Sequence, residues 1–211
     1  MSKAKKESFF WTSFSDLMTS LFFVMLLLFV LTMGLLHKKI TVQNVELETK
    51  RKIEQIEEAL KNIDPNLFEY KEEYQKHVLK FDVWFPRPGL SNINTIRNVT
   101  ETKDKLLYAG RAIKSFIEKT RQEHKDLQYL LIIEGQASKD GYWENYELSY
   151  KRALALYNFW KEKGIIFDEQ YCEVLISGSG EGGSMREPRE REEYNQRFLI
   201  HIIPKIGNIG K

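Results

Sequence analysis

The longest apolar stretch of the sequence lies near its N-terminus and predicts a membrane-spanning helix. Between residues 17 and 36 the residues that are not strongly apolar carry no charge, and they are Thr19, Ser20, Thr32 and Gly34. A helix rises about 1.5 Å per residue, so this stretch can cross the roughly 30 Å hydrocarbon core of a bilayer. A cleavable signal peptide has a shorter apolar core of about 7–15 residues that ends at a small-residue cleavage site, whereas this one continues into Leu36 and His37. We therefore predict an uncleaved transmembrane helix over residues 9–37, after a tail over 1–8.

One ionisable residue, Asp16, lies inside this predicted helix. Residues three or four positions away share a helix face with it, and all four carry hydroxyl groups: Thr12, Ser13, Thr19 and Ser20. Beyond Ser20 the same face becomes apolar, so a polar track leads from the N-terminal side to the carboxylate and ends there. A carboxylate in a membrane helix costs about 2.5–3.5 kcal/mol on insertion scales and indicates a functional residue. The pattern predicts that Asp16 carries an ion and that the four hydroxyl residues support the ion path, unless Asp16 merely caps a helix that starts at Leu17.

A polar helical segment follows over residues 38–63 and ends at Asp64-Pro65. Its last part carries apolar residues in a 3-4-3 spacing: Ile53, Ile56, Leu60 and Ile63. This spacing has two interpretations that the sequence leaves open. The apolar residues form a short seam between two copies of the chain, or they pack onto the domain that follows. We assign residues 38–66 to a helical linker.

The remaining residues alternate between strand-like and helix-like patterns. Strands are predicted over 78–85, 129–134, 172–176 and 197–203, and amphipathic helices over 101–121 and 147–163. Helices that alternate with strands indicate a sheet covered by helices on one face. The sequence therefore predicts a membrane protein with one transmembrane helix, a helical linker and an α+β domain with a mixed sheet over 67–211.

Composition excludes several classes of function. A net charge of +2 gives no general electrostatic case for nucleic-acid binding. The single cysteine, Cys172, excludes an intrachain disulfide, and the four histidines lack metal-ligand spacing. The glycine-rich segment 178–183 lacks the Lys-Ser/Thr that follows in a phosphate-binding loop. We find no nucleophile, base and acid in a hydrolytic arrangement, so we expect neither an enzyme nor a metal or cofactor site.

The residues around Asp16 resemble a known signature. Trp11-Thr-Ser-Phe-Ser-Asp16-Leu-Met-Thr19 is similar to W-x-x-[YF]-[AS]-D-x-M-T of the MotB-type stator subunits, which include flagellar MotB and PomB proteins and ZorB of the Zorya anti-phage systems. The resemblance implies that Asp16 carries a transported proton or sodium ion in a rotary motor. It also implies two copies of this chain inside a pentamer of a MotA- or ZorA-like polytopic protein. The N-terminus would be cytoplasmic and the remainder would lie outside the inner membrane, with a plug role possible for the linker.

A second resemblance covers residues 78–203. Asn145-Tyr-Glu-Leu-Ser149-Tyr-Lys-Arg152-Ala153 matches N-x-x-L-S-x-x-R-A of the OmpA-like peptidoglycan-binding domains. Gly164-Ile165, Gly178-Ser-Gly180-Glu181 and Asn195-Gln-Arg197 stand where that family has G-I, G-x-G-E and N-R-R. The resemblance implies a peptidoglycan site formed by Ser138, Asp140, Asn145, Arg152 and Arg197.

One position departs from the family. Ser138 in Glu134-Gly-Gln-Ala-Ser138 stands where the family has the Asp of its G-H-T-D motif. In the family, this Asp and the Arg of L-S-x-x-R-A, which corresponds to Arg152, hold the diaminopimelate of the stem peptide. Asp140, two residues further on, can take over the missing charge. The alternative is that Arg152 only supports the fold of a domain that has lost its ligand.

Taken together, the two resemblances favour a stator B subunit. Within that class, the sequence Ser-Asp-Leu-Met-Thr around Asp16 and the short chain favour the Zorya-like group. A flagellar MotB-type subunit is one alternative. A purely structural, membrane-anchored peptidoglycan-binding protein is the other, although such an anchor has no reason to carry hydroxyls around a membrane aspartate.

Overall fold

The computed structural model describes residues 3–206 except 62, 88, 126 and 184, and describes no side chain of residues 3–10, 12 or 206. The chain divides into two compact units, Met1–Lys52 and Ile53–Lys211, and each is described here by itself.

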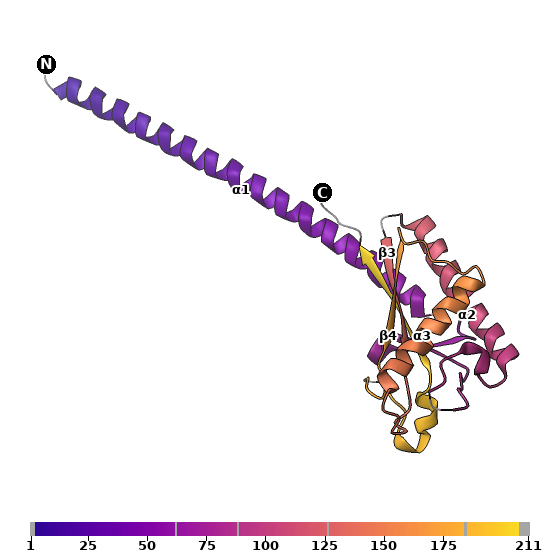
Figure 1. Cartoon of the computed structure of the whole chain (residues 1–211). Helices are drawn as coiled ribbons and strands as arrows, with labels where there is room; N and C mark the ends of the chain where they lie inside the picture. The colour runs from indigo at the N-terminus through magenta and orange to yellow at the C-terminus, as the bar shows by residue number, and fades with distance from the viewer. Residues whose placement is uncertain (1–2, 62, 88, 126, 184, 207–211) are drawn as a thin grey trace. The chain divides into compact units, whose positions relative to one another are not determined.

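The first unit consists of helix α1 (Lys3–Lys61), which continues into the second unit (Figure 1). By length and composition this helix is able to cross a membrane. Its apolar side chains between Leu17 and Leu36 are exposed all around the helix, and a helix that is apolar on every face requires a membrane or protein environment. Because α1 begins well before Leu17, Asp16 does not cap a helix that starts there, and that interpretation is wrong.

The second unit is built on a five-stranded mixed sheet in the order β1-β2-β5-β3-β4. Strands β3 and β4 pair in parallel, and the other neighbours are antiparallel. The strands are β1 (Phe68–Lys71), β2 (Lys76–Leu79), β3 (Leu127–Gly135), β4 (Cys172–Gly178) and β5 (Phe198–Ile206). The helices are α2 (Val99–Glu123) and α3 (Asn145–Glu162), with short 3-10 helices η1 (Glu72–Tyr74), η2 (Ile93–Thr95) and η3 (Arg189–Asn195). The predicted fold class, an apolar N-terminal helix followed by an α+β domain with a mixed sheet, is confirmed.

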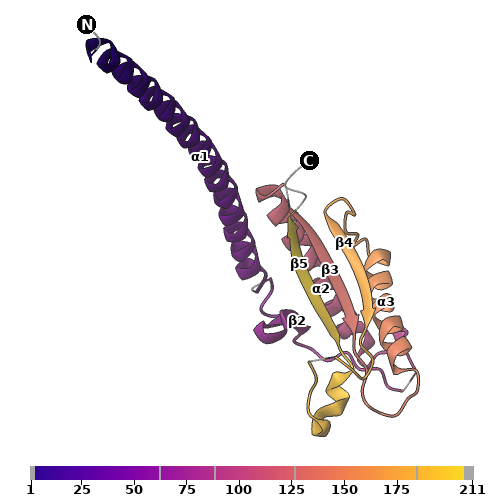
Figure 2. The same ribbon diagram turned by 90° about the vertical axis from the view of Figure 1, so that its left-hand side faces the viewer.

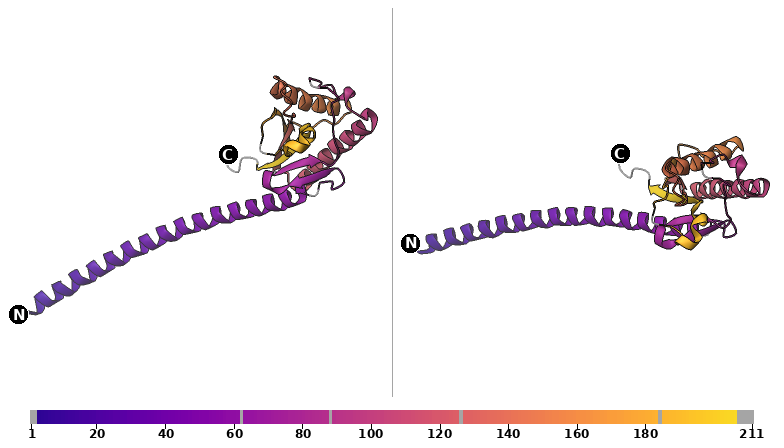
Figure 3. Two further views of the ribbon diagram at one scale, coloured as in Figure 1. Left: turned by 90° about the horizontal axis from the view of Figure 1, so that it is seen from below. Right: turned by 60° about the horizontal axis from the view of Figure 1, so that its bottom comes forward.

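Helices α2 and α3 cover the same face of the sheet (Figures 2 and 3). On that face alternate residues of β3 are buried, namely Leu127, Tyr129, Leu131 and Ile133. The two helices are fixed to each other by Trp160 of α3, whose indole Nε1 donates to the carbonyl of Leu106 at 2.8 Å. A side chain at Gly110 would lie 2.7 Å from this indole, so the close approach of the helices requires glycine there.

The first two strands differ from the prediction. The predicted strand over 78–85 ends at Leu79, and its partner β1 was not predicted at all. Val83 and Phe85 are nevertheless buried in the core. The alternation of apolar residues in this segment therefore indicates that one side of the segment is buried. It does not require the backbone hydrogen bonds of a strand.

The end of α1 packs into the domain. Ile56 and Leu60 are buried in the main hydrophobic core, and Ile63 packs against it. The backbone carbonyl of Leu60 lies 2.8 Å from Nε2 of the buried His77 on β2. The packing interpretation of the 3-4-3 spacing is thus confirmed. Because Ile56 and Leu60 face their own domain, cysteines placed at these two positions are not expected to crosslink two copies of the chain.

The other face of the sheet carries a buried ionic group centred on Glu134 of β3. Its carboxylate lies 2.8 Å from Nζ of Lys76 on β2 and 3.4 Å from Nε2 of His201 on β5. Burial by itself would raise the pKa of Glu134, but hydrogen bonds from His201, Lys76 and Ser179 outweigh burial and lower it to about 2. The group joins three strands of the sheet.

We predict that Glu134→Gln destabilises the domain and removes part of its acid sensitivity. A carboxylate whose pKa is lower in the folded state stabilises the fold above its unfolded pKa, near 4.5, and this contribution is lost as the pH falls toward 2. The shift corresponds to stabilisation on the order of 3 kcal/mol at neutral pH. Chemical unfolding of the full chain in detergent at pH 7 and at pH 3 measures it.

The matched control is Glu173→Gln on the neighbouring strand β4. Glu173 pairs with Lys205 at 2.6 Å, but its side chain is 61% exposed, against 10% for Glu134. An exposed pair contributes about 0–1 kcal/mol, so this variant should unfold almost like the unmodified chain. Equal effects of the two substitutions would contradict the role assigned to the buried group.

Candidate functional site

The candidate site lies where β3 ends and the chain turns into α3, in the loop of residues 136–144. The loop is tied to two other segments by backbone hydrogen bonds, from Gln136 to the carbonyl of Arg197 at 3.0 Å and from Ala137 to that of Gly180 at 2.8 Å. A side chain at Gly135 would lie 2.0 Å from the backbone oxygen of Ser149, so glycine allows α3 to lie directly against the strand. Three segments distant in sequence, around residues 135–153, 180 and 197, therefore meet at one end of the sheet.

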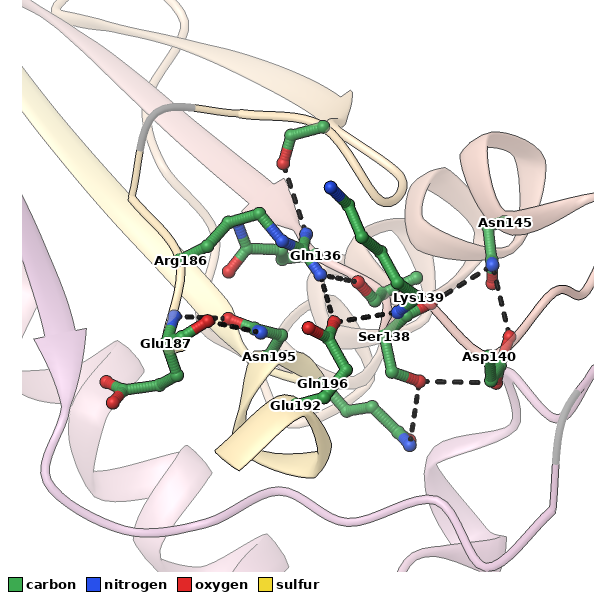
Figure 4. A network of polar contacts seen from close by, with 12 residues as sticks. Gln136, Ser138, Lys139, Asp140, Asn145, Arg186, Glu187, Glu192, Asn195 and Gln196 are labelled. Carbon is green, nitrogen blue, oxygen red and sulfur yellow. Dashed lines mark hydrogen bonds and ion pairs between the residues drawn. The ribbon is translucent and has the colours of Figure 1, made fainter. Parts of the chain in front are cut away.

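Three of the predicted residues, Ser138, Asp140 and Asn145, form one hydrogen-bonded group (Figure 4). The amide of Asn145 donates to the backbone oxygen of Ser138 at 3.0 Å and to Oδ1 of Asp140 at 3.1 Å. The hydroxyl of Ser138 donates to Oδ2 of Asp140 at 3.2 Å. Burial opposes ionisation of Asp140, but hydrogen bonds from the backbone of Tyr142, from Asn145 and from Ser138 lower its pKa. The structure thus places an ionised carboxylate beside Ser138, the position at which the family motif has an aspartate.

Arg152 lies two turns after Asn145 on the buried face of α3 and is 3% exposed. Its Nε donates to the backbone oxygen of Leu90 at 2.9 Å, and its guanidinium lies 4.2 Å from the ring centre of Phe85. Burial lowers the pKa of Arg152 to about 10, against the favourable effect of Asp140. The guanidinium is therefore charged at neutral pH, and its closest contacts are a carbonyl and an aromatic ring.

Several polar atoms at this site have no partner among the residues that the structure describes. Nη1 of Arg152 is a buried donor without an acceptor, and Oδ1 of Asn145 and Oε1 of Gln196 are buried acceptors without donors. These are three of the five such side-chain atoms found in the described residues. Native proteins pair almost all buried polar groups, because an unpaired one costs roughly 1–3 kcal/mol. A donor and two acceptors left open beside a carboxylate fit a ligand that carries both a carboxylate and an ammonium group.

Arg197, the fifth predicted residue, lies in a different set of contacts. Its Nε donates to Oε1 of Gln136 at 3.0 Å, its Nη2 donates to the carbonyl of Met185 at 3.1 Å, and its Nη1 pairs with Glu187 at 3.3 Å. All three nitrogen atoms are thus used within the fold: Nη1 and Nη2 hold the segment 185–187, and Nε holds Gln136, at the residue that precedes β5. The structure does not bring Arg197 together with Arg152, and direct contact of Arg197 with a ligand stays a prediction.

Two further contributors were not found from the sequence. Gln196 donates to the hydroxyl of Ser138 at 3.3 Å. Arg186 donates to the backbone oxygen of Ala137 at 3.0 Å and pairs with Glu192, which accepts from the backbone N–H of Lys139 at 2.7 Å. The mixed-charge segment 185–193 therefore fixes the backbone of the site loop (Figure 4). Its composition is that of any solvated loop, so only its contacts reveal the role.

In the first unit, Asp16 lies on the exposed surface of α1 with Ser13, Thr19 and Ser20. Thr19 donates its hydroxyl to the carbonyl of Ser15 at 2.7 Å, and Ser20 donates to that of Leu17 at 2.9 Å. The side chain of Thr12 lies outside the described residues. The hydroxyl groups can satisfy themselves on their own helix, so the stripe is compatible with a membrane helix before any partner is added.

Within the part of the chain that the structure describes, no group of three or more His, Cys, Asp or Glu side chains is placed to hold a metal ion.

No protein-family model matches the chain, and no curated protein matches it. Solved structures do. The peptidoglycan-associated lipoprotein from Burkholderia pseudomallei matches with 13% identity and a TM-score of 0.37, covering 59% of this chain and 91% of that one. The OmpA-like domain of FopA1 from Francisella tularensis matches with 18% identity and a TM-score of 0.40, over 67% and 83%. The periplasmic domain of Helicobacter pylori MotB matches with 15% identity and a TM-score of 0.38, over 67% and 82%.

Proposed function

We propose that this chain is the B subunit of an ion-driven rotary stator, in which Asp16 carries the ion and the α+β domain anchors the complex to peptidoglycan. In this proposal the domain is OmpA-like and lies in the periplasm, and α1 crosses the inner membrane with a cytoplasmic N-terminus. The chain has no enzymatic role and binds no cofactor, since a proton or sodium ion is its cargo.

The observation that carries the wall-binding half is the unpaired Nη1 of the buried Arg152 close to Asp140. A guanidinium binds a carboxylate strongly when water is excluded, because charge-assisted hydrogen bonds are about twice as strong as neutral ones. Asp140, with the free oxygens of Asn145 and Gln196, complements an ammonium group. The diaminopimelate of a stem peptide carries both groups on one residue, so its carboxylate can pair with Arg152 while its ammonium group pairs with Asp140.

The ion-carrying half is supported by the position of Asp16 within α1, among hydroxyl residues and next to an apolar stretch. One helix cannot shield a carboxylate from lipid, so Asp16 needs a partner-lined cavity. Two copies of this chain inside a pentamer of a MotA- or ZorA-like protein would provide that cavity.

Within this class we favour a Zorya-like defence system over a flagellar motor, on the sequence around Asp16. Gene neighbours test this choice. A polytopic ring subunit encoded beside helicase and nuclease genes would support the defence system, and one beside flagellar genes would overturn that choice in favour of the flagellar motor.

Wall binding is tested by sedimentation of the full chain, purified in detergent, with isolated peptidoglycan. We expect the chain to sediment and to be released by a free tripeptide that ends in diaminopimelate. A tripeptide whose diaminopimelate is replaced by lysine is the matched control, because it lacks the second carboxylate that Arg152 would bind. A chain that stays in solution would contradict wall binding, and a chain that both tripeptides release equally would contradict recognition of diaminopimelate.

A further inference from the structure

An unusual group of exposed aromatic side chains lies beside the candidate site. Trp143, Tyr146 and Tyr150 are 84%, 60% and 44% exposed. Among the described residues from 53 onward, eight large hydrophobic side chains are exposed, and three of the eight fall within these eight positions of the sequence. Exposed aromatic residues that gather at one place indicate a binding surface.

Tyr146 and Tyr150 are four residues apart in α3 and share one face of it, and Trp143 lies in the turn that leads into the helix, two residues before its first residue. We call these three residues the aromatic stripe. Tyr146 is held in place by the glycine-rich segment after β4. A side chain at Gly180 would lie 2.6 Å from its ring, so the ring rests directly on the backbone there.

This aromatic stripe is continuous with the candidate site. Trp143 follows Asp140 by three residues, and the backbone N–H of Tyr142 between them donates to Oδ1 of Asp140 at 3.0 Å. Tyr146 follows Asn145, whose amide donates to the same carboxylate oxygen at 3.1 Å. A ligand held at Asp140 and Asn145 therefore has its continuation within reach of the stripe.

The charges around the stripe argue against a polyanionic ligand. Glu144 and Glu147 lie between the three aromatic residues in the sequence, and the Lys nearest to them, Lys151, is paired with Glu147 at 2.6 Å. A nucleic acid or a phosphate-rich polymer would meet these carboxylates. A sugar ring of low charge suits the stripe better. Its C–H face can pack on an aromatic ring, while the Tyr O–H and Trp N–H groups form hydrogen bonds with its hydroxyl groups.

We propose that Trp143, Tyr146 and Tyr150 bind sugar rings of the glycan strand while the site at Arg152 and Asp140 holds the stem peptide. This inference rests on the proposed function, since stem peptides are covalently attached to that strand and bring its sugars close to any bound peptide. The domain then recognises the junction of sugar and peptide. It distinguishes attached stem peptides from free ones.

The test compares two soluble ligands on the full chain in detergent by calorimetry. One is the free stem tripeptide, and the other is the same peptide joined to its disaccharide. We expect the disaccharide-peptide to bind the unmodified chain about tenfold more tightly, a difference of roughly 1.4 kcal/mol. The double variant Trp143→Ala/Tyr150→Ala should lose this advantage and keep its affinity for the free tripeptide. Tyr108→Ala, which removes an exposed tyrosine from α2, is the matched control and should change neither affinity.

The outcomes separate this inference from the proposed function. Tripeptide binding without any gain from the disaccharide, or a gain that the double variant retains, would overturn the aromatic sugar site and leave wall binding intact. Failure of both ligands to bind the unmodified chain would overturn wall binding and the sugar site together. Equal loss of both ligands in the double variant would show a general structural effect and would also overturn the sugar site.

Discussion

Replacement of Asp16 by Asn is expected to abolish the ion-driven activity of the complete system and to leave the complex assembled. Asn has almost the same shape as Asp, so insertion of α1 and packing against a partner should persist. A carboxylate can bind and release a proton or a sodium ion in each cycle, whereas an amide stays neutral and cannot. The measurement is an activity assay of cells that carry the whole system, beside purification of the mutant complex with its ring partner.

The matched control for Asp16→Asn is Glu46→Gln, which removes a carboxylate from the polar part of the same helix, where the side chain is exposed. It should keep full activity. Thr19→Ala should have an intermediate effect, because the Thr19 hydroxyl already bonds its own helix at Ser15 and water can replace it near the ion. Full activity of Asp16→Asn in an assembled complex would defeat the ion-carrier proposal and favour a plain membrane anchor.

Arg152→Met is expected to weaken binding to peptidoglycan at least about tenfold without lowering the stability of the domain. Loss of a charge-assisted hydrogen bond to the ligand corresponds to roughly 1.5–3 kcal/mol. Met has a flexible unbranched chain that can fill the same space against Phe85. The substitution removes a buried charge with an unpaired nitrogen, which is costly in the folded state, and it also removes the hydrogen bond from Nε to Leu90. These two effects oppose each other, so the free energy of unfolding should stay about the same. Sedimentation with peptidoglycan and chemical unfolding measure the two effects.

The control for Arg152→Met is Arg97→Ala, which removes a guanidinium that stacks on Trp84 at 4.5 Å in an exposed part of the domain. Its binding should match that of the unmodified chain, because Arg97 takes no part in the candidate site. If Arg152→Met unfolds the domain, Arg152 is needed for the fold. If the variant binds peptidoglycan normally, Arg152 does not hold the ligand.

The sequence determined the features that depend on neighbours along the chain. The apolar run over 17–36 and the hydroxyl residues around Asp16 are local, because helix geometry alone brings positions three and four apart together. Helices α2 and α3 and strands β3, β4 and β5 were predicted to within about three residues of their ends, since their apolar periodicity already describes the face that they bury. The fold class followed from their alternation.

The candidate site was predicted in part. The motif resemblance indicated Ser138, Asp140, Asn145 and Arg152, and the structure brings the first three into one hydrogen-bonded group. The motif resemblance could not indicate Gln196 or the contacts of Arg186, because these contacts join segments about 50 or more residues apart. Nor could it separate Arg197, which is fully occupied within the fold, from Arg152, which keeps an open donor. Whether a buried charge is paired depends on which segments surround it.

Only the tertiary structure decided what Ile56 and Leu60 do. Their 3-4-3 spacing is the same for a helix that pairs with a second copy and for one that packs on its own domain, because both bury a single apolar stripe. Strand β1 likewise has no pattern of its own, and it forms because β2 offers it a hydrogen-bonding edge. Local periodicity states that a side chain must be buried, whereas the contacts between distant segments decide against what it is buried and which polar atoms remain open for a ligand.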